Sequence, residues 1–141
     1  MNEREFEDMY STMVNYHYMD DEHTRQRLLN FGGKKKLCKM LFDGEQIGGV
    51  SLGHNTDENA AVTVFLSDDV LVVTGMRFIM LQSRLLGTLV KEMPIQSVCS
   101  VEWSGKGNTL HLSGTRSSLN FYVDDSGIDI IKSLVYQIYS K

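Results

Sequence analysis

The chain has 141 residues, of which 42% are hydrophobic and 23% are charged. These values are typical of one globular domain with its own core, and they exclude an intrinsically disordered chain. The formal net charge of −4 argues against a general nucleic-acid binder, because the phosphate backbone attracts basic surfaces.

The sequence favours a cytoplasmic protein. No apolar run reaches the roughly 18 residues that a membrane-spanning helix needs. The opening segment, MNEREFEDMYS, lacks the basic start and apolar middle of a signal peptide. Cys38 and Cys99 lie far apart and neither stands at metal-ligand spacing from a histidine, so both are expected to be free thiols.

Residues 1–36 are predicted to form a helical arm with two helices. Over residues 2–17, apolar side chains recur at the spacing of three and four that places them on one helical face. These residues are Phe6, Met9, Tyr10, Met13, Val14 and His17. Asp20 or Asp21 is expected to cap a second helix, which Gly32-Gly33 would end. A lysine-rich connection is expected to follow it.

Residues 37–141 are predicted to form a domain built mainly from strands. Apolar and polar residues alternate as in an antiparallel sheet with one face on a core. Cys99, Val101 and Trp103 are expected to share one face of their strand. Residues 54–59 are predicted to form a polar loop, and residues 76–81 fit either a strand or a packed loop. Strands are expected at residues 46–52, 62–67, 70–74, 89–95, 99–103, 109–113 and 119–123, with a turn at 67–69 and a hairpin loop at 104–108.

A final helix is expected after Asp124-Asp125-Ser126, which would cap it. Its apolar side comprises Ile128, Ile131, Leu134, Val135 and Ile138. Short strands followed by one amphipathic helix are most economically buried as a curved sheet or open barrel that the helix closes. The predicted fold class is therefore α+β and mostly β, with Val64, Val101, Leu112 and Phe121 sharing an interior with Ile131.

Four stretches of residues 41–141 resemble the bacterial pleckstrin-homology (PH) domains, and the YokE-like group in particular. The resemblance implies a seven-stranded PH-like barrel with one C-terminal helix. The stretches are Phe42-Asp43-Gly44-Glu45-Gln46-Ile47, Val64-Phe65-Leu66-Ser67-Asp68-Asp69-Val70-Leu71-Val72-Val73, Val90-Lys91-Glu92-Met93-Pro94-Ile95-Gln96-Ser97-Val98, and the closing residues 119–139.

Two departures from the family pattern concern lipid binding. Asp69-Val70 stands where the family often has a basic residue, and residues 53–59 contain no Lys or Arg. The phosphoinositide-binding members of the family hold phosphates with basic residues of this loop. Binding of a lipid headgroup at this position is therefore not favoured.

No catalytic, cofactor or metal site is predicted. His17, His23, His54 and His111 are scattered singly, whereas an enzyme needs a positioned nucleophile, base or metal cluster. A metal held by His17, His23 and Asp20-Asp21 is an alternative to a solvated helix junction, which is preferred. Gly32-Gly33-Lys34 lacks the spacing and the Ser or Thr of a phosphate-binding loop.

Two groups of residues are candidates for binding. Lys34, Lys35, Lys36 and Lys39 form a basic cluster, which would contact an acidic partner, nucleic acid or anionic lipid, or would be solvated and pair with the acidic arm. The apolar face of the arm would pack on its own domain, on a second copy of the chain or on another protein. The residues of that face are Phe6, Met9, Tyr10 and Met13.

The function that these observations favour is that of a non-catalytic module that binds a protein, which includes self-association. Recruitment to an anionic membrane surface is the alternative. A phage or mobile-element inhibitor of a host defence protein is a further hypothesis, since YokE-like proteins occur in prophages and clustered acids can imitate phosphate charge. These acids are Glu3, Glu5, Glu7, Asp8, Asp20, Asp21 and Glu22.

Overall fold

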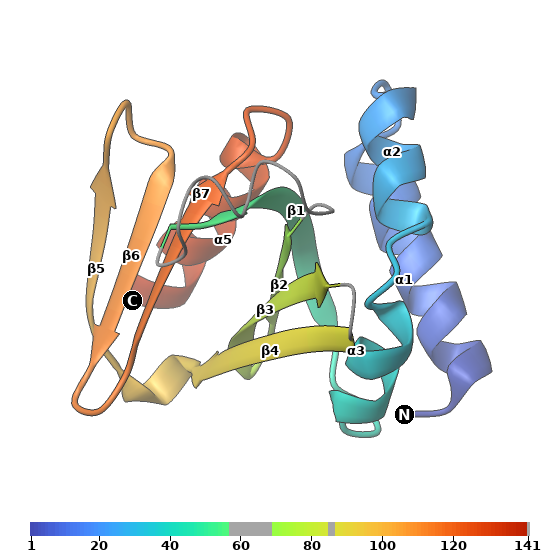
Figure 1. Ribbon diagram of the computed structural model, residues 1–141, viewed down its shortest axis with the longest axis horizontal. Coiled ribbons are helices and arrows are strands. Elements are labelled where there is room, and N and C mark those ends of the chain that lie inside the picture. The colour runs from blue at the N-terminus through green and yellow to red at the C-terminus, as the bar shows by residue number, and fades with distance from the viewer. Residues whose placement is uncertain (57–68, 85–86, 141) are drawn as a thin grey trace.

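The computed structural model describes residues 1–56, 69–84 and 87–140, and Figure 1 shows its elements. The helices are α1 (Glu3–His17), α2 (Glu22–Leu29), α3 (Lys34–Met40), the short 3-10 helix η1 (Ile95–Ser97) and α5 (Ile128–Tyr139). The strands are β1 (Ile47–Asn55), β2 (Asp69–Thr74), β3 (Arg77–Arg84), β4 (Gly87–Pro94), β5 (Val98–Ser104), β6 (Thr109–Gly114) and β7 (Ser118–Val123).

The strands form one curved sheet in the order β4-β3-β2-β1-β7-β6-β5, and all neighbouring strands are antiparallel. With the C-terminal helix and the preceding helices, this order confirms the predicted fold class, a seven-stranded curved sheet with one C-terminal helix. Residues 76–81, left open between strand and loop, belong mostly to β3. Pro94 ends β4, which is an edge strand, as expected for a proline that cannot donate to a ladder. The strand expected at residues 62–67 lies outside the described residues.

The sheet bends where β1 passes from one half to the other. Gly53 is the residue of β1 that pairs with both Asp69 of β2 and Val123 of β7. A Cβ atom at Gly53 would lie 1.9 Å from the backbone oxygen of Tyr122. Only glycine therefore fits at this bend, because no side chain can occupy the space next to that carbonyl group.

In the half of the sheet made of β1 to β4, most residues of β1, β2 and β3 are buried on both faces, whereas the edge strand β4 is mostly exposed or half-buried. One face packs under α1, α2 and α3, which stand along one side of the sheet in Figure 1, and we call this the outer core. Consecutive residues of β2 serve different cores, so its sequence is apolar at every position from Val70 to Val73. The outer core includes Phe6, Tyr10, Val14, Leu28, Leu37, Val50, Leu52, Val70, Val72, Ile79 and Leu81.

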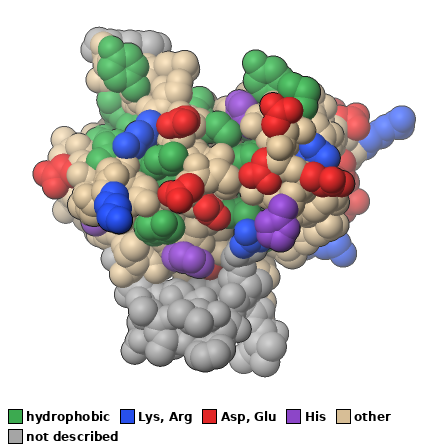
Figure 2. Space-filling view, turned by 90° about the horizontal axis from the view of Figure 1, so that it is seen from above, with side chains coloured by type: hydrophobic (Ala, Val, Ile, Leu, Met, Phe, Trp, Pro, Cys, Tyr) green, Lys and Arg blue, Asp and Glu red, His purple; other side chains and the backbone are tan. Residues whose placement is uncertain are grey.

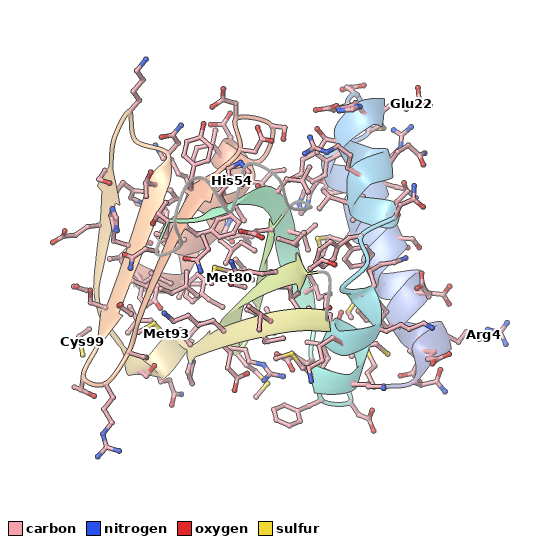
Figure 3. The ribbon with its side chains drawn as sticks, viewed as in Figure 1. Arg4, Glu22, His54, Met80, Met93 and Cys99 are labelled. Atoms are coloured by element: carbon pink, nitrogen blue, oxygen red, sulfur yellow. The ribbon has the colours of Figure 1, made fainter. Side chains whose placement is uncertain are left out.

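The second core lies inside the curve of the sheet and is closed by α5, and we call it the inner core. Met80 and Met93 point into this space between the two halves of the sheet (Figure 3). The predicted shared interior is confirmed for Leu112, Phe121 and Ile131, against which the half-buried Val101 packs. Val64 lies outside the described residues. The inner core also includes Leu71, Val73, Phe78, Leu110, Leu119, Val123 and Val135.

Three local predictions about helices can be compared with the structure. Asp21 caps α2, because its carboxylate accepts from the backbone N–H of Thr24 at 3.1 Å. The prediction of a lysine-rich connection after Gly33 was wrong, since residues 34–40 form the helix α3. Its apolar side is short: Leu37 and Cys38 are buried, and Leu41 follows one turn later. A helix of two turns carries too few apolar positions to show a period among lysines.

The cap predicted for the last helix was also wrong. The N-cap of α5 is Gly127, which makes no side-chain cap bond. A Cβ atom at Gly127 would lie 2.2 Å from Ser51 Oγ and 2.7 Å from the Tyr18 hydroxyl. Glycine is therefore required at this position because the start of α5 lies so close to β1 and to the end of α1. Helix capping does not explain the choice of residue.

Two predictions about the strands need correction, one about the end of β1 and one about the face of Cys99. β1 continues to Asn55, so His54 lies in a strand and not in a loop. Cys99 is exposed, while Val101 and Trp103 are half-buried, because the pairing of β5 with β6 shifts between Val98 and Ser100. A bulge of this kind turns the residues before it to the other face. Both Cys38 and Cys99 are free thiols.

Candidate functional site

The edge of the sheet formed by β5 is the first feature of a candidate binding site. Within the described part of the chain, β5 pairs with β6 on one side and has no strand on the other. An edge strand presents unpaired N–H and C=O groups along its free side. These groups can form a ladder with an extended segment of another chain.

A groove of about 720 Å3 lies beside this edge, between β5 and α5. The groove combines aromatic rings, small hydroxyl side chains and one charged group. Aromatic residues of this kind contribute much of the binding energy at protein interfaces. The lining residues are Trp103, Lys132, Ser133, Val135, Tyr136, Tyr139 and Ser140.

The floor of the groove is fixed and its rim is exposed. Tyr139 stacks on Phe78 with ring centroids 6.4 Å apart, and its hydroxyl donates to Ile95 O at 3.1 Å. Burial raises the pKa of Tyr139 above its usual value. The ammonium group of Lys132 lies 5.1 Å from the centroid of the Trp103 ring. Tyr136 is 72% exposed, so its ring is available to a partner.

The structure divides the four arm residues into two pairs. Phe6 and Tyr10 are buried in the outer core, where the Tyr10 hydroxyl donates to Leu28 O at 2.7 Å. Met9 and Met13 are half-buried and line a shallow depression of about 530 Å3. Tyr16, which is 74% exposed, stands in the same depression beside β1. A partner that contacts the arm would therefore meet Met9, Met13 and Tyr16.

The structure also separates Lys34 from the other lysines of the predicted cluster. Lys34 Nζ lies 3.3 Å from Glu7 Oε1 and 5.5 Å from the centroid of the Tyr10 ring, so it binds α3 to α1. Lys35, Lys36 and Lys39 are exposed on α3. A surface groove of about 410 Å3 next to them has acids as well as lysines in its walls. Its lining residues are Met1, Glu3, Phe6, Glu7, Lys34, Lys35, Cys38 and Lys39.

Figure 2 shows the top of the molecule, where acidic side chains are spread across the face. The Lys and Arg side chains visible there do not gather into one patch. An anionic lipid surface would be repelled by such a face at low salt. This distribution agrees with the absence of Lys and Arg from residues 53–59.

A buried ionic cluster that the sequence did not predict lies around Arg77. Arg77 binds Glu45 through two hydrogen bonds, Nε to Oε2 at 3.0 Å and Nη2 to Oε1 at 2.9 Å. The same guanidinium donates to Met40 O at 2.7 Å and to the carboxylate of Glu92. Glu45 and Glu92 are the acids of two stretches that carry the PH resemblance. Their shared partner shows that both have a structural role here.

The cluster also fixes the charge state of Glu45. Burial of the carboxyl group opposes its ionisation, but hydrogen bonds from Arg77, Thr74 and the backbone N–H of Phe42 outweigh burial. The pKa of Glu45 is therefore lowered from its usual value of 4.5. The ionised pair connects the segment before β1 to the β2–β3 hairpin.

Among the residues that the structure describes, no group of three or more His, Cys, Asp or Glu side chains could hold a metal ion. His17 packs at the end of α1, and burial lowers its pKa. No helix within residues 1–56, 69–84 and 87–140 is long and apolar enough to span a membrane.

Comparison with known proteins gives structural similarity alone, since no protein-family model and no curated protein sequence matches the chain. The fold is similar to the C-terminal domain of an unknown protein from Leishmania infantum, with a TM-score of 0.56 and 13% identity over 77% of this chain and 94% of that chain. A pleckstrin homology domain from Shewanella amazonensis matches with a TM-score of 0.49 and 17% identity over 76% of this chain and 95% of that chain. The Leishmania domain and this chain share a fold.

Proposed function

We propose that this chain is a protein-binding module that uses its PH-like scaffold to hold an extended segment of a partner protein. The segment would lie along the free edge of β5, with side chains in the groove between β5 and α5. The observation that carries the proposal is that an unpaired strand edge borders a groove lined by Trp103, Tyr136 and Tyr139. The backbone would supply affinity and the aromatic groove would select side chains.

The charge in the groove favours a partner segment with an acidic residue beside an apolar one. Lys132 is the charged side chain among the lining residues, and its ammonium group stands over the Trp103 ring. An acidic side chain of the segment could pair with Lys132 while an apolar neighbour packs on Trp103 and Tyr136.

The test uses Trp103 as a reporter, because it is the sole tryptophan of the chain. Peptides would be selected on the full chain from a random peptide library, and their binding followed by Trp103 fluorescence. Tyr136→Ala is expected to weaken binding about 30-fold, the effect of losing a central aromatic contact of about 2 kcal/mol.

Tyr16→Ala is the matched control, because Tyr16 is equally exposed but lies outside the groove. It should leave the affinity unchanged. Selected peptides that bind Tyr136→Ala as tightly as the wild type would refute the groove. Loss of binding in Tyr16→Ala instead would move the site to the depression beside Met9 and Met13.

Three narrower hypotheses remain predictions. Membership of the YokE-like group and inhibition of a host defence protein rest on the resemblance and on the acidic residues of the arm. Recruitment to an anionic membrane rests on the exposed Lys35, Lys36 and Lys39. Flotation of the full chain with anionic vesicles would test recruitment, and recovery of the protein in the vesicle-free fraction at low salt would reject it.

A further inference from the structure

Three polar side chains on the outer face of β5, β6 and β7 form a continuous chain of hydrogen bonds. Ser104 is the last residue of β5, His111 lies in β6 and Asn120 lies in β7. Ser104 Oγ is 2.5 Å from His111 Nε2, and His111 Nδ1 is 2.6 Å from Asn120 Oδ1. His111 is directly opposite Asn120 in the register, so neighbouring strands bring these groups together.

The proton positions follow from the chemistry of the partners. Asn120 Oδ1 can only accept, so His111 Nδ1 carries the hydrogen and donates it. In the neutral imidazole, His111 Nε2 then has a free lone pair, which accepts the hydroxyl hydrogen of Ser104. The backbone carbonyl of Asn120 accepts from Thr56 N at 3.2 Å, which helps to hold this residue in place. The imidazole is thus oriented with its basic nitrogen towards the serine.

We propose that Ser104 is a nucleophilic serine that accepts an acyl group, with His111 as its general base and Asn120 as a positioning residue. A serine is activated when its hydroxyl group lies within hydrogen-bond reach of a base and a third group orients that base. The proposal goes beyond peptide binding, because these side chains lie on the outer face of the sheet and do not line the groove between β5 and α5.

The acyl transfer requires an activated ester as donor. Ser104 Oγ forms a bond to the acyl carbon while its proton moves to His111 Nε2. The bond between the acyl carbon and the leaving oxygen then breaks, and His111 returns the proton to the leaving group. The products are acylated Ser104 and a free alcohol or phenol, with His111 neutral again.

The surroundings of Ser104 permit this reaction. Ser104 is exposed and is followed by the hairpin residues Gly105 and Gly107, whose φ angles are +66° and +86°. Glycines at these positions place no side chain beside the hydroxyl group. Glu102 is opposite His111 in the register, so a negative charge adjoins the imidazolium that forms during the transfer.

The experiment treats the full chain with 4-nitrophenyl acetate and measures acetylation of each serine by mass spectrometry after acid quenching. Ser100 is the internal control, because it is exposed on the same face of β5 and is paired with Ser113, not with a histidine. Ser104 is expected to react about 100-fold faster than Ser100, within the usual contribution of a general base.

Variants assign the roles of the other two residues. His111→Gln should reduce the rate at Ser104 to that at Ser100. Asn120→Asp, which keeps the acceptor, should retain the rate within a few-fold, whereas Asn120→Leu should lower it. Circular dichroism of each variant checks that the sheet is intact. Equal rates at Ser104 and Ser100 in the wild type, or an unchanged rate in His111→Gln, would overturn the proposal, and an unchanged rate in Asn120→Leu would overturn the positioning role.

Discussion

Arg77 illustrates how one side chain connects segments that are distant in the sequence. Its guanidinium joins the carbonyl group of Met40 at the end of α3, Glu45 before β1 and Glu92 in β4. It also lies over the Phe42 ring, 4.9 Å from the centroid. Breaking such a pair leaves a buried charge without compensation, which costs more than the pair itself contributes.

We expect Arg77→Met to destabilise the protein by about 3–5 kcal/mol, because the Glu45 carboxylate would remain buried without its partner. Urea unfolding followed by circular dichroism measures this loss. The matched control is Arg116→Met in the exposed turn between β6 and β7, which should change stability by less than about 0.5 kcal/mol.

The loss in Arg77→Met should also depend on pH. Because the pKa of Glu45 is lower in the folded state, its ionisation contributes stability above pH 4.5 that is lost as the pH falls through the folded pKa. The difference between the wild type and Arg77→Met should therefore shrink below pH 4.5. A difference that stays constant down to acid unfolding would show that the pair does not fix the charge of Glu45.

The sequence alone did not indicate this cluster. Glu45 and Glu92 lie in stretches that carry the PH resemblance, but nothing in those stretches identifies Arg77 as their partner. Arg77 is 32 residues from Glu45 and 15 from Glu92. An ion pair over such separations leaves no period in the sequence, unlike the alternating residues of a strand.

At the scale of single elements, the bend of β1 gives the sharpest prediction. Gly53→Ala should prevent the pairing of β1 with β7, because the new Cβ atom would overlap the Tyr122 carbonyl oxygen. We expect loss of the folded state or a large drop in the unfolding midpoint, measured by thermal denaturation. Gly75→Ala is the control, since no atom lies within 4 Å of its added Cβ. Equal midpoints for the two variants would contradict the close approach at Gly53.

The elements that could be predicted are those with a long and simple period. β6 and β7 alternate between buried and less buried residues, with Leu110, Leu112, Leu119 and Phe121 inside, and their prediction is confirmed. α3 was missed because it is short, and the extent of β1 was misjudged because glycines interrupt its pattern. In both cases tertiary packing decides the structure and local preference does not.

For the whole molecule, the helical arm is part of the core. α1, α2 and α3 cover the face of the sheet that carries Val50, Val70, Val72 and Ile79. From the sequence, the apolar face of α1 could pack on its own sheet, on a second copy or on another protein. Phe6 and Tyr10 are buried in the outer core, so this part of the apolar face packs on the sheet of its own chain. The division of the chain into an arm of residues 1–36 and a domain of residues 37–141 stays a prediction.

Removing residues 1–37 should expose the whole of that sheet face to water. We expect the shortened chain to aggregate or unfold, because an apolar surface of this extent is not tolerated on a monomer. Sedimentation velocity of residues 38–141 against the full chain, at equal concentration, measures the outcome. A shortened chain that sediments as a folded monomer would show that the outer core is dispensable.

The double burial of β2 has a consequence for the substitutions that the chain can accept. In β6 every second position faces outward and could exchange one polar residue for another with little effect on the stability of the fold. In β2 neither set of alternating positions can accept a polar residue. Val70 and Val72 pack against the arm, while Leu71 and Val73 pack in the inner core under α5. In a library of single substitutions, β2 should thus appear as an uninterrupted block of intolerance beside strands that tolerate change at alternate positions.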